Sequence, residues 1–261
     1  MSGFDVSLGL AGAVPLPTIR VVAEAAERAG LHALWLNDTP VGDSLAGLAA
    51  AAEVTTRLRL ATGVIPLDRV EAAGIAARVA ELGLPHDRLT LGVGSGAARH
   101  PLPLVTAGLA ELASLGVPVL LGALGPRMRR LGAQRADGLL LSWLTPATVA
   151  SARAQALADA SAAGRAVPRV VLYARAIADP AARPELEAEA ARYAGFASYA
   201  ANFARLGHGA IETTVDASVD PAAAVAGYRD AVDELVFRAI TVDGSTEAIL
   251  RVVQAAASAR G

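Results

Sequence analysis

A glycine-rich turn that leads into an arginine-rich helix is the segment of this sequence best suited to hold a ligand. The turn covers residues 122–125, and the helix predicted after it begins at Pro126 and carries Arg127, Arg129 and Arg130. Free backbone N–H groups and the helix dipole attract anions at a helix N-terminus, and glycines let a phosphate approach closely. Taken alone, these residues fit a phosphate site and also an ordinary turn with solvated arginines.

A few polar and aromatic side chains elsewhere follow predicted strands. Asp38, Thr39 and His100 are the candidate catalytic residues, because a carboxylate, a hydroxyl and an imidazole can hold or move protons. Asp38 could instead cap a local turn, and His100 could be an ordinary loop histidine beside a proline. Trp143 follows another strand and is a candidate for lining a pocket.

Composition excludes several classes of chemistry. All 23 basic residues are arginine, so no lysine is present to form a Schiff base or a phosphate-binding P-loop. The absence of cysteine excludes disulfides, thiol nucleophiles and cysteine-ligated metals. The 25 acidic residues leave a net charge of −2, which argues against nucleic-acid and membrane partners. No targeting segment or membrane span is recognised, so a cytoplasmic protein is expected.

Apolar, β-rich segments alternate with alanine-rich helical patterns along the whole chain. They are continuous runs of Val, Leu and Ile, as parallel strands covered by helices are. Eight strands are predicted over residues 5–10, 33–37, 58–64, 89–93, 118–123, 138–142, 169–177 and 234–240. Helices are predicted between them over residues 17–29, 43–54, 70–82, 104–115, 126–134, 145–163 and 244–259.

Eight strand–helix units in one domain of residues 1–261 predict an α/β fold of the (β/α)8 TIM-barrel type. Three further helices, over residues 180–193, 195–206 and 221–230, form an insertion of about residues 178–230 before the eighth strand. The alternative is a doubly wound open sheet, since residues 92–97 give a weak dinucleotide fingerprint. The pair His100-Pro101, expected to interrupt a helix there, opposes that alternative. In a barrel, the candidate residues above lie at the carboxyl ends of strands, where barrel enzymes have their active sites.

Residues 119–146, which read V-L-L-G-A-L-G-P-R-M-R-R-L-G and then A-D-G-L-L-L-S-W-L-T-P, resemble the luciferase-like monooxygenase superfamily. Within it, they are most similar to oxidoreductases that use the deazaflavin coenzyme F420. Residues 4–10 and 30–38 resemble the first two strands of the family. Its T-G-V signature falls at residues 62–64, its R-x-x-L-G-V-G-x-G strand at residues 88–96, and its last strand at residues 232–238.

The resemblance implies roles for particular residues. It implies a cis peptide bond between Gly63 and Val64 that braces the cofactor ring, and a phosphate site at residues 122–125. Its cofactor-binding positions are Asp38, Thr62, Gly63, Val64, Gly94, Ser95, Gly122, Ala123, Leu124, Gly125, Pro126 and Arg130. Trp143, Phe196 and Tyr199 are the candidate substrate residues, although the aromatic stripe at helical spacing that includes the last two also fits a core or an interface.

Two departures from the family bear on function. Some relatives have a histidine that donates or accepts a proton where this chain has Thr39, so no residue is clearly assigned to proton transfer. The long excursion that usually separates the fourth and fifth strands is shortened here to residues 97–116. We therefore expect a more open barrel mouth, or one covered by residues 180–220 or by a partner subunit.

These observations predict an oxidoreductase that uses F420 to transfer hydride to or from a small organic substrate. The alternatives are an FMN-dependent monooxygenase and a barrel that binds a flavin or deazaflavin without turnover. An unrelated phosphate-binding barrel is disfavoured, because lysine is absent and carboxylates at strand ends are few. We expect a homodimer and no metal ion.

Overall fold

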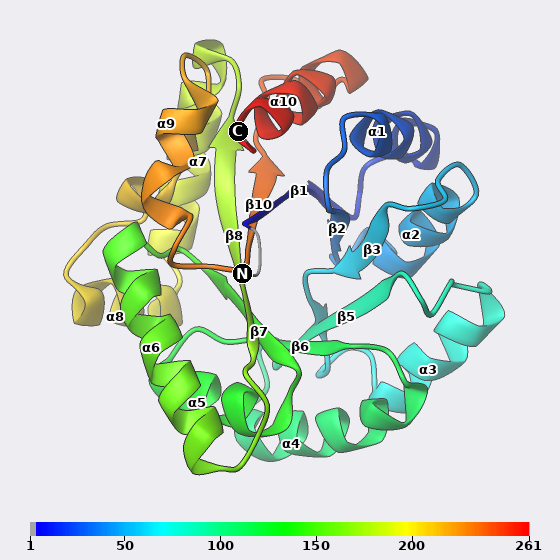
Figure 1. Cartoon of the computed structure of the whole chain (residues 1–261), viewed down its shortest axis with the longest axis vertical. Coiled ribbons are helices and arrows are strands. Elements are labelled where there is room, and N and C mark those ends of the chain that lie inside the picture. The colour runs from blue at the N-terminus through cyan, green and yellow to red at the C-terminus, as the bar shows by residue number, and fades with distance from the viewer. Residues whose placement is uncertain (1–3, 261) are drawn as a thin grey trace.

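The predicted strands form a closed parallel barrel. The computed structural model describes residues 4–260, and the barrel strands follow one another in chain order around its axis (Figure 1). The barrel strands are β1 Asp5–Ala11, β2 Ala33–Asn37, β3 Arg59–Thr62, β5 Leu89–Gly94, β6 Val119–Gly122, β7 Gly138–Ser142, β8 Arg169–Ile177 and β10 Glu234–Ala239. Strand β10 pairs with both β8 and β1, which closes the barrel. The predicted fold class is confirmed.

The helices form an outer ring around this barrel (Figure 1). They are α1 Leu16–Arg28, α2 Ser44–Ala52, α3 Ala72–Glu81, α4 Pro101–Leu112, α5 Pro126–Arg135, α6 Pro146–Ala162, α7 Arg183–Ala194, α8 Ala197–Leu206, α9 Pro221–Val225 and α10 Thr246–Ser258. Their N-termini are fixed by local chemistry. The side chains of Asp43 and Ser245 accept backbone N–H bonds at the starts of α2 and α10, and Thr145 forms a capping box with Thr148 at α6.

Helix α4 corrects one expectation. The sequence predicted a helix from residue 104 and an interruption at His100-Pro101, whereas α4 begins at Pro101 with His100 in the N-cap position. Proline is favoured in the first turn of a helix, because its missing N–H would have no partner there. Pro101 therefore starts the helix instead of interrupting it. The connection between β5 and β6 contains only this helix and a 3-10 turn at Ala113–Leu115.

The predicted insertion lies between β8 and β10. It contains α7, α8 and α9 and a short strand, β9 Val215–Asp216, which extends the sheet by pairing with the end of β8. A second short strand, β4 Ile65–Pro66, pairs with the end of β5. Residues of α7 and α8 line the cavity at the barrel mouth. The insertion thus covers part of the mouth, which was one of the alternatives that the shortened excursion left open.

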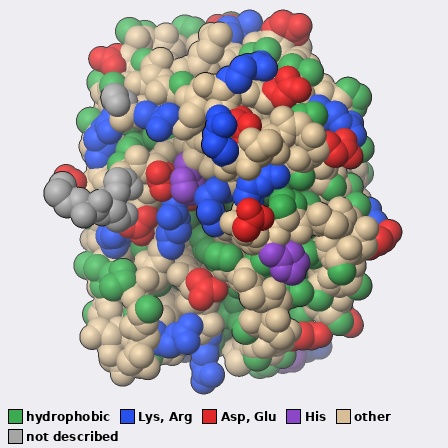
Figure 2. All heavy atoms as spheres, turned by 45° about the vertical axis from the view of Figure 1, so that its right-hand side comes forward, with side chains coloured by type: hydrophobic (Ala, Val, Ile, Leu, Met, Phe, Trp, Pro, Cys, Tyr) green, Lys and Arg blue, Asp and Glu red, His purple; other side chains and the backbone are tan. Residues whose placement is uncertain are grey.

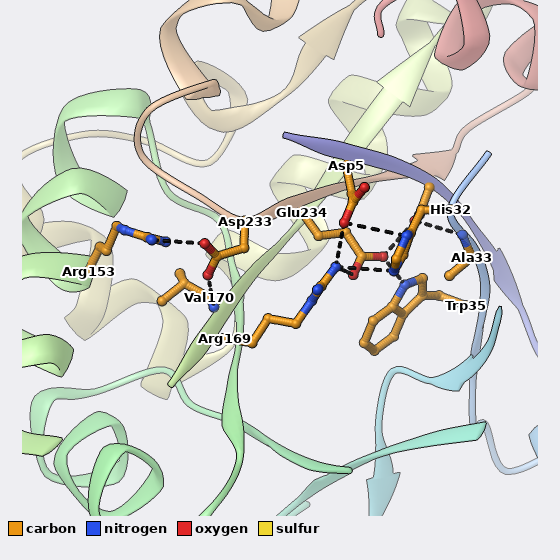
Figure 3. Close-up of polar contacts among 10 residues, drawn as sticks. Asp5, His32, Ala33, Trp35, Arg153, Arg169, Val170, Asp233 and Glu234 are labelled. Atoms are coloured by element: carbon orange, nitrogen blue, oxygen red, sulfur yellow. Dashed lines mark hydrogen bonds and ion pairs between the residues drawn. The ribbon is translucent and has the colours of Figure 1, made fainter. Parts of the chain in front are cut away.

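A network of charged and polar side chains lies at the opposite end of the barrel, where the strands begin (Figure 3). At its centre is the carboxylate of Glu234, which is 2 % exposed and accepts hydrogen bonds from Ser7 Oγ at 2.5 Å and Trp35 Nε1 at 2.6 Å. Arg169 donates to Glu234 at 3.0 Å and to Asp5 at 2.8 Å. A buried carboxylate needs such partners, so this network joins β1, β2, β8 and β10.

The surface carries both signs of charge. Figure 2 shows arginine side chains interspersed with acidic ones on one face, with no large field of a single sign. Within residues 4–260, no helix is long and apolar enough to cross a membrane.

Candidate functional site

A cavity of about 810 Å³ opens at the carboxyl ends of the strands. This is the end of the barrel at which (β/α)8 enzymes place their active sites. Its walls come from the loops after β2, β3, β5 and β6, from inward-facing residues of β7 and β8, and from α7 and α8. The predicted residues that line it are Asp38, Gly63, Val64, Gly94, Ser95, Gly122, Ala123, Leu124, Gly125 and Tyr199. The structure therefore brings together residues from five separate segments of the predicted site.

The floor of the cavity is built around the Gly63–Val64 peptide bond, which is cis. This is the bond for which the sequence resemblance implied a cis geometry. A methyl group on Gly94 would lie 2.9 Å from Val64 Cγ2, and one on Gly122 would lie 2.8 Å from Val64 Cγ1. Both distances are shorter than a real contact, so glycine at these two positions makes room for the Val64 side chain.

Tyr173 and Asn37 brace this floor from two other strands. The Tyr173 hydroxyl donates to Asn37 Oδ1 at 2.9 Å, and Asn37 Nδ2 donates to the carbonyl oxygen of Gly63. Burial raises the pKa of the Tyr173 phenol, although the charges of Arg238 and Arg175 oppose the change. The phenol therefore stays protonated and acts as a hydrogen-bond donor at neutral pH.

Asp38 lines the cavity, but its carboxylate already has partners. Oδ1 accepts from Arg69 at 2.5 Å, and Oδ2 accepts from the Ser44 hydroxyl at 3.0 Å. The carboxylate thus holds the loop after β2 against α2 and against the segment that follows β4. These contacts give it a positioning role that the sequence left open beside a catalytic one.

At the anion site predicted at the turn before α5, the buried positive charge belongs to Arg129 and not, as the resemblance implied, to Arg130. Arg130 does not line the cavity; its guanidinium is largely exposed and pairs with Asp159 of α6 at 3.3 Å. Arg129 is the buried arginine of this helix, 8 % exposed, and its Nε and Nη2 have no hydrogen-bond partner among the described residues. It is not itself a lining residue, and it lies behind Gly125 and Met128, which are. Its amide donates to the Gly125 carbonyl at 3.0 Å, which places it one turn into α5.

A second arginine, Arg205 of α8, lies near Arg129 and lines the cavity. Burial and the positive charge of Arg205 lower the pKa of Arg129 to about 10. Within the described part of the chain no carboxylate forms an ion pair with either guanidinium, and Arg205 donates instead to Asn202 Oδ1 at 2.5 Å. Two cations without a counterion beside the glycine-rich turn form a site that attracts an anion.

The candidate substrate residues fall into two groups. Tyr199 lines the cavity, whereas Trp143 is buried behind the lining and packs against Tyr193, with ring centroids 4.8 Å apart. Phe196 is 48 % exposed and lies outside the lining, with its ring edge-on to Tyr193. The aromatic stripe therefore forms a packed cluster from which Tyr193 and Tyr199 reach the cavity.

The remaining candidates stand outside the cavity. Thr62 is buried and exchanges hydrogen bonds with the Gly92 backbone, so it joins β3 to β5. Thr39 lies in a turn that pairs with Gly42, and His100 is exposed at the start of α4. Pro126 is the first residue of α5.

Several lining residues were missed by the sequence analysis. Those with polar or charged side chains are Asn37, Ser142, Tyr173, Arg175, Tyr193, Ser198, Asn202 and Arg205. A signal was present for two of them, because Tyr173 and Arg175 are polar residues two positions apart in a strand that is otherwise apolar after Arg169. That spacing places both on the same face of the strand.

Comparisons with known proteins agree with this geometry. Residues 2–111 match the family model of luciferase-like monooxygenases. No curated protein matches the chain. Among solved structures, the coenzyme F420-dependent tetrahydromethanopterin reductase from Methanopyrus kandleri is 18 % identical, with a TM-score of 0.70 over 96 % of this chain and 98 % of that one.

Two other solved structures share the fold. An F420-dependent secondary alcohol dehydrogenase is 14 % identical, with a TM-score of 0.75 over 98 % of this chain and 99 % of its own. The FMN-bound oxygenating constituent of 3,6-diketocamphane monooxygenase from Pseudomonas putida is 13 % identical, with a TM-score of 0.69 over 96 % of this chain and 98 % of that one.

The fold and the cavity define a (β/α)8 barrel of the kind found in F420-dependent reductases and flavin monooxygenases. The family match and this fold together confirm the resemblance to the luciferase-like monooxygenase superfamily.

Proposed function

We propose that the protein is an oxidoreductase that holds coenzyme F420 in the 810 Å³ cavity and catalyses hydride transfer to or from a small organic substrate. The observation that carries the proposal is the pair Arg129 and Arg205 beside the turn at residues 122–125. Arg129 is a buried guanidinium without a counterion, which is costly unless an anionic group binds beside it, and Arg205 is an exposed guanidinium that lines the cavity nearby. A cofactor with a phosphate-bearing side chain supplies that group.

The residues of the cavity suit a flat ring and a phosphate. Gly94 and Gly122 leave room for Val64 in the floor, and the lining turn at residues 122–125 leads directly into the N-terminus of α5. A bound deazaflavin supplies hydride chemistry, which the side chains alone do not provide. In this proposal Asn37 and Tyr173 fix the floor, Arg129 and Arg205 bind the phosphate, and α7 and α8 exclude water.

FMN is the alternative cofactor, since it presents the same combination of ring and phosphate. A barrel that binds either molecule without turnover is the second candidate function. It is favoured by one observation: among the described lining residues there is no histidine, and the lining carboxylate Asp38 is engaged by Arg69 and Ser44.

The homodimer expected from the sequence is part of the same proposal. Light scattering, which measures the mass of the particle in solution, tests it.

The phosphate end of the proposal is tested at Gly125. A side chain built there would meet no described atom within 4 Å beyond its chain neighbours, so a substitution should leave the fold intact. We expect Gly125→Asp to reduce F420 or FMN affinity strongly, because its carboxylate would stand against the phosphate. The isosteric control Gly125→Asn adds the same bulk without charge and should retain more of the affinity.

Absorbance or fluorescence titration measures both variants. Equal affinity in the two would move the phosphate site elsewhere. If the cofactor binds to the wild-type protein and no hydride donor reduces it there, the non-catalytic binder replaces the enzyme as the favoured function.

A further inference from the structure

A third arginine, Arg175 of β8, occupies the wall of the cavity between the floor and the helices of the insertion. It lies two residues after Tyr173, so both side chains point into the barrel. Its side chain is 7 % exposed, yet it lines the cavity. None of the roles proposed above uses this group.

The guanidinium of Arg175 lies over two aromatic rings. Its Cζ lies 4.0 Å from the centroid of the Trp143 ring and 4.6 Å from that of Tyr193. Cation–π contacts of this kind occupy the flat face of a guanidinium and leave its N–H edge free to donate. Trp143, which the sequence suggested as a substrate residue, thus orients Arg175 from behind the lining.

The N–H edge of Arg175 lacks partners. Its Nε and Nη1 are buried and make no hydrogen bond with any residue among 4–260. The nearest carboxylate oxygen, Glu189 Oε1, is 3.6 Å from Nε, which is beyond hydrogen-bonding distance. Glu189 also binds Arg192, and the charge of Arg238, the register partner of Arg175 on β10, acts on it too, so three guanidinium groups share one carboxylate. The local charge is positive.

This site is distinct from the proposed phosphate site. Tyr199 of α8 lies near Arg175, whose charge opposes the increase that burial causes in the pKa of Tyr199. Arg205, on the same helix, lies near Arg129. The six residues from Tyr199 to Arg205 span roughly 9 Å at the rise of an α-helix. The cavity therefore has two cationic ends.

We propose that Arg175 binds the carboxylate of a small organic acid, with the body of that acid against Tyr193 and Tyr199. A planar carboxylate can accept two parallel hydrogen bonds from the guanidinium edge, and the tyrosine rings offer apolar surface beside it. The assignment of this acid as the substrate rests on the proposed function. The assignment of a carboxylate-binding site to Arg175 is independent of it. The substrate class is then an organic anion rather than a neutral ketone or alkane.

Isothermal titration calorimetry with matched pairs of acids and amides tests this inference. Benzoate is compared with benzamide and acetate with acetamide, on the protein without cofactor and again with F420 or FMN added. We expect at least one of the acids to bind about tenfold more tightly than its amide, because a buried hydrogen bond to a charged group is lost with the charge. Arg175→Gln should weaken binding of that acid by about tenfold, and Arg175→Lys should do so less.

Arg130→Gln is the matched control, since Arg130 pairs with Asp159 outside the cavity, and it should leave acid binding unchanged. The inference is wrong if neither acid binds, if both acids bind no better than their amides, or if Arg175→Gln binds an acid as the wild type does. Should Arg175→Gln fail to fold, the comparison of acid with amide on Arg129→Met, which lacks the cation of the proposed phosphate site, decides: a preference for the acid that persists there supports the inference, and its loss contradicts it. Acid binding together with failure of both cofactors to bind would leave this site standing and contradict the proposed function.

Discussion

The hydroxyl of Tyr173 donates a hydrogen bond to Asn37 Oδ1 at 2.9 Å and so ties β8 to the end of β2 across the cavity floor. Asn37 in turn donates to the carbonyl of Gly63, next to Val64. The floor of the candidate site is thus held by a chain of neutral hydrogen bonds between three segments that are far apart in the sequence.

Tyr173→Phe should lower the free energy of unfolding by about 1 kcal/mol, because it leaves the buried Asn37 oxygen without its donor. Urea denaturation measures the change. Tyr228→Phe is the control, since the Tyr228 hydroxyl donates to the Leu144 carbonyl over a longer distance, 3.4 Å, and its removal should cost less. Equal losses of unfolding free energy in the two variants would show that the Tyr173–Asn37 hydrogen bond does not stabilise the cavity floor more than the longer Tyr228 bond stabilises its own site.

Arg129→Met should stabilise the ligand-free protein while weakening cofactor binding. Methionine keeps an apolar stem in the buried position and removes a charge whose burial has no compensating partner, so we expect a gain of roughly 1–3 kcal/mol in unfolding free energy. The lowered pKa of Arg129 agrees in sign, because a base with a depressed pKa in the folded state destabilises the fold at every pH below that value.

Arg130→Gln is the matched control for Arg129→Met. It removes an exposed ion pair with Asp159 and should change stability by less than about 0.5 kcal/mol, with cofactor affinity unchanged. If Arg130→Gln abolished binding and Arg129→Met did not, the phosphate site would be the one that the sequence resemblance assigned.

Glu234→Gln should destabilise the protein by about 2–3 kcal/mol without changing the cavity. It removes the charge that accepts from Ser7, Trp35 and Arg169 at the far end of the barrel (Figure 3). Thermal and urea unfolding measure the effect. Glu53→Gln, which breaks the exposed pair with Arg20, should lie within about 0.5 kcal/mol of the wild type. A loss of similar size in both variants would contradict the structural role of Glu234.

Stability should fall as the pH drops below about 6.5, and His32 should cause part of the fall. Burial and the charges of Arg169 and Arg59 lower the pKa of His32, although Glu234 and Asp5 oppose them. In the folded state its Nε2 lies 3.1 Å from Arg169 Nη2, where a neutral ring accepts a hydrogen bond. As the pH falls, His32 is therefore protonated at a higher pH in the unfolded chain than in the folded one. The stability that the neutral ring provides above the unfolded pKa of His32 is lost below that pKa.

Urea denaturation of the wild type and His32→Asn between about pH 7.5 and pH 5 measures this contribution. The variant should show a flatter profile in that window. Carboxylates whose pKa is lowered, such as Asp233 and Asp216, act at lower pH in both proteins. Identical slopes for wild type and variant would rule out His32 as the titrating group.

The barrel was predictable from the sequence because each strand and helix is marked locally. Residues 139–141 and 170–172 are continuous apolar runs, and the structure has strands over Gly138–Ser142 and Arg169–Ile177. Glycine and proline mark the ends of elements for steric reasons, and the turn before Pro126 was recognised in this way. The strand ends then indicated which loops meet at the cavity.

The side chains of the site were less predictable for two physical reasons. Successive residues of a helix point about 100° apart, so the sequence does not say whether Arg129 or Arg130 faces inward. Strands that are buried on both faces carry few polar residues, so the spacing of Tyr173 and Arg175 places both on one face of β8 without showing that this face points into the barrel. The contributions of α7 and α8 depend on how the insertion packs over the mouth, and local patterns carry no information about that.

The central claim is that the cavity binds a flavin-type cofactor through Arg129 and Arg205. Titration of the wild-type protein and of Arg129→Met with F420 and with FMN, followed by absorbance or fluorescence, tests it most directly. The account predicts micromolar binding of at least one of the two by the wild type and a loss of about tenfold or more in the variant. Binding of neither cofactor by the wild type, or equal binding by both proteins, would contradict it.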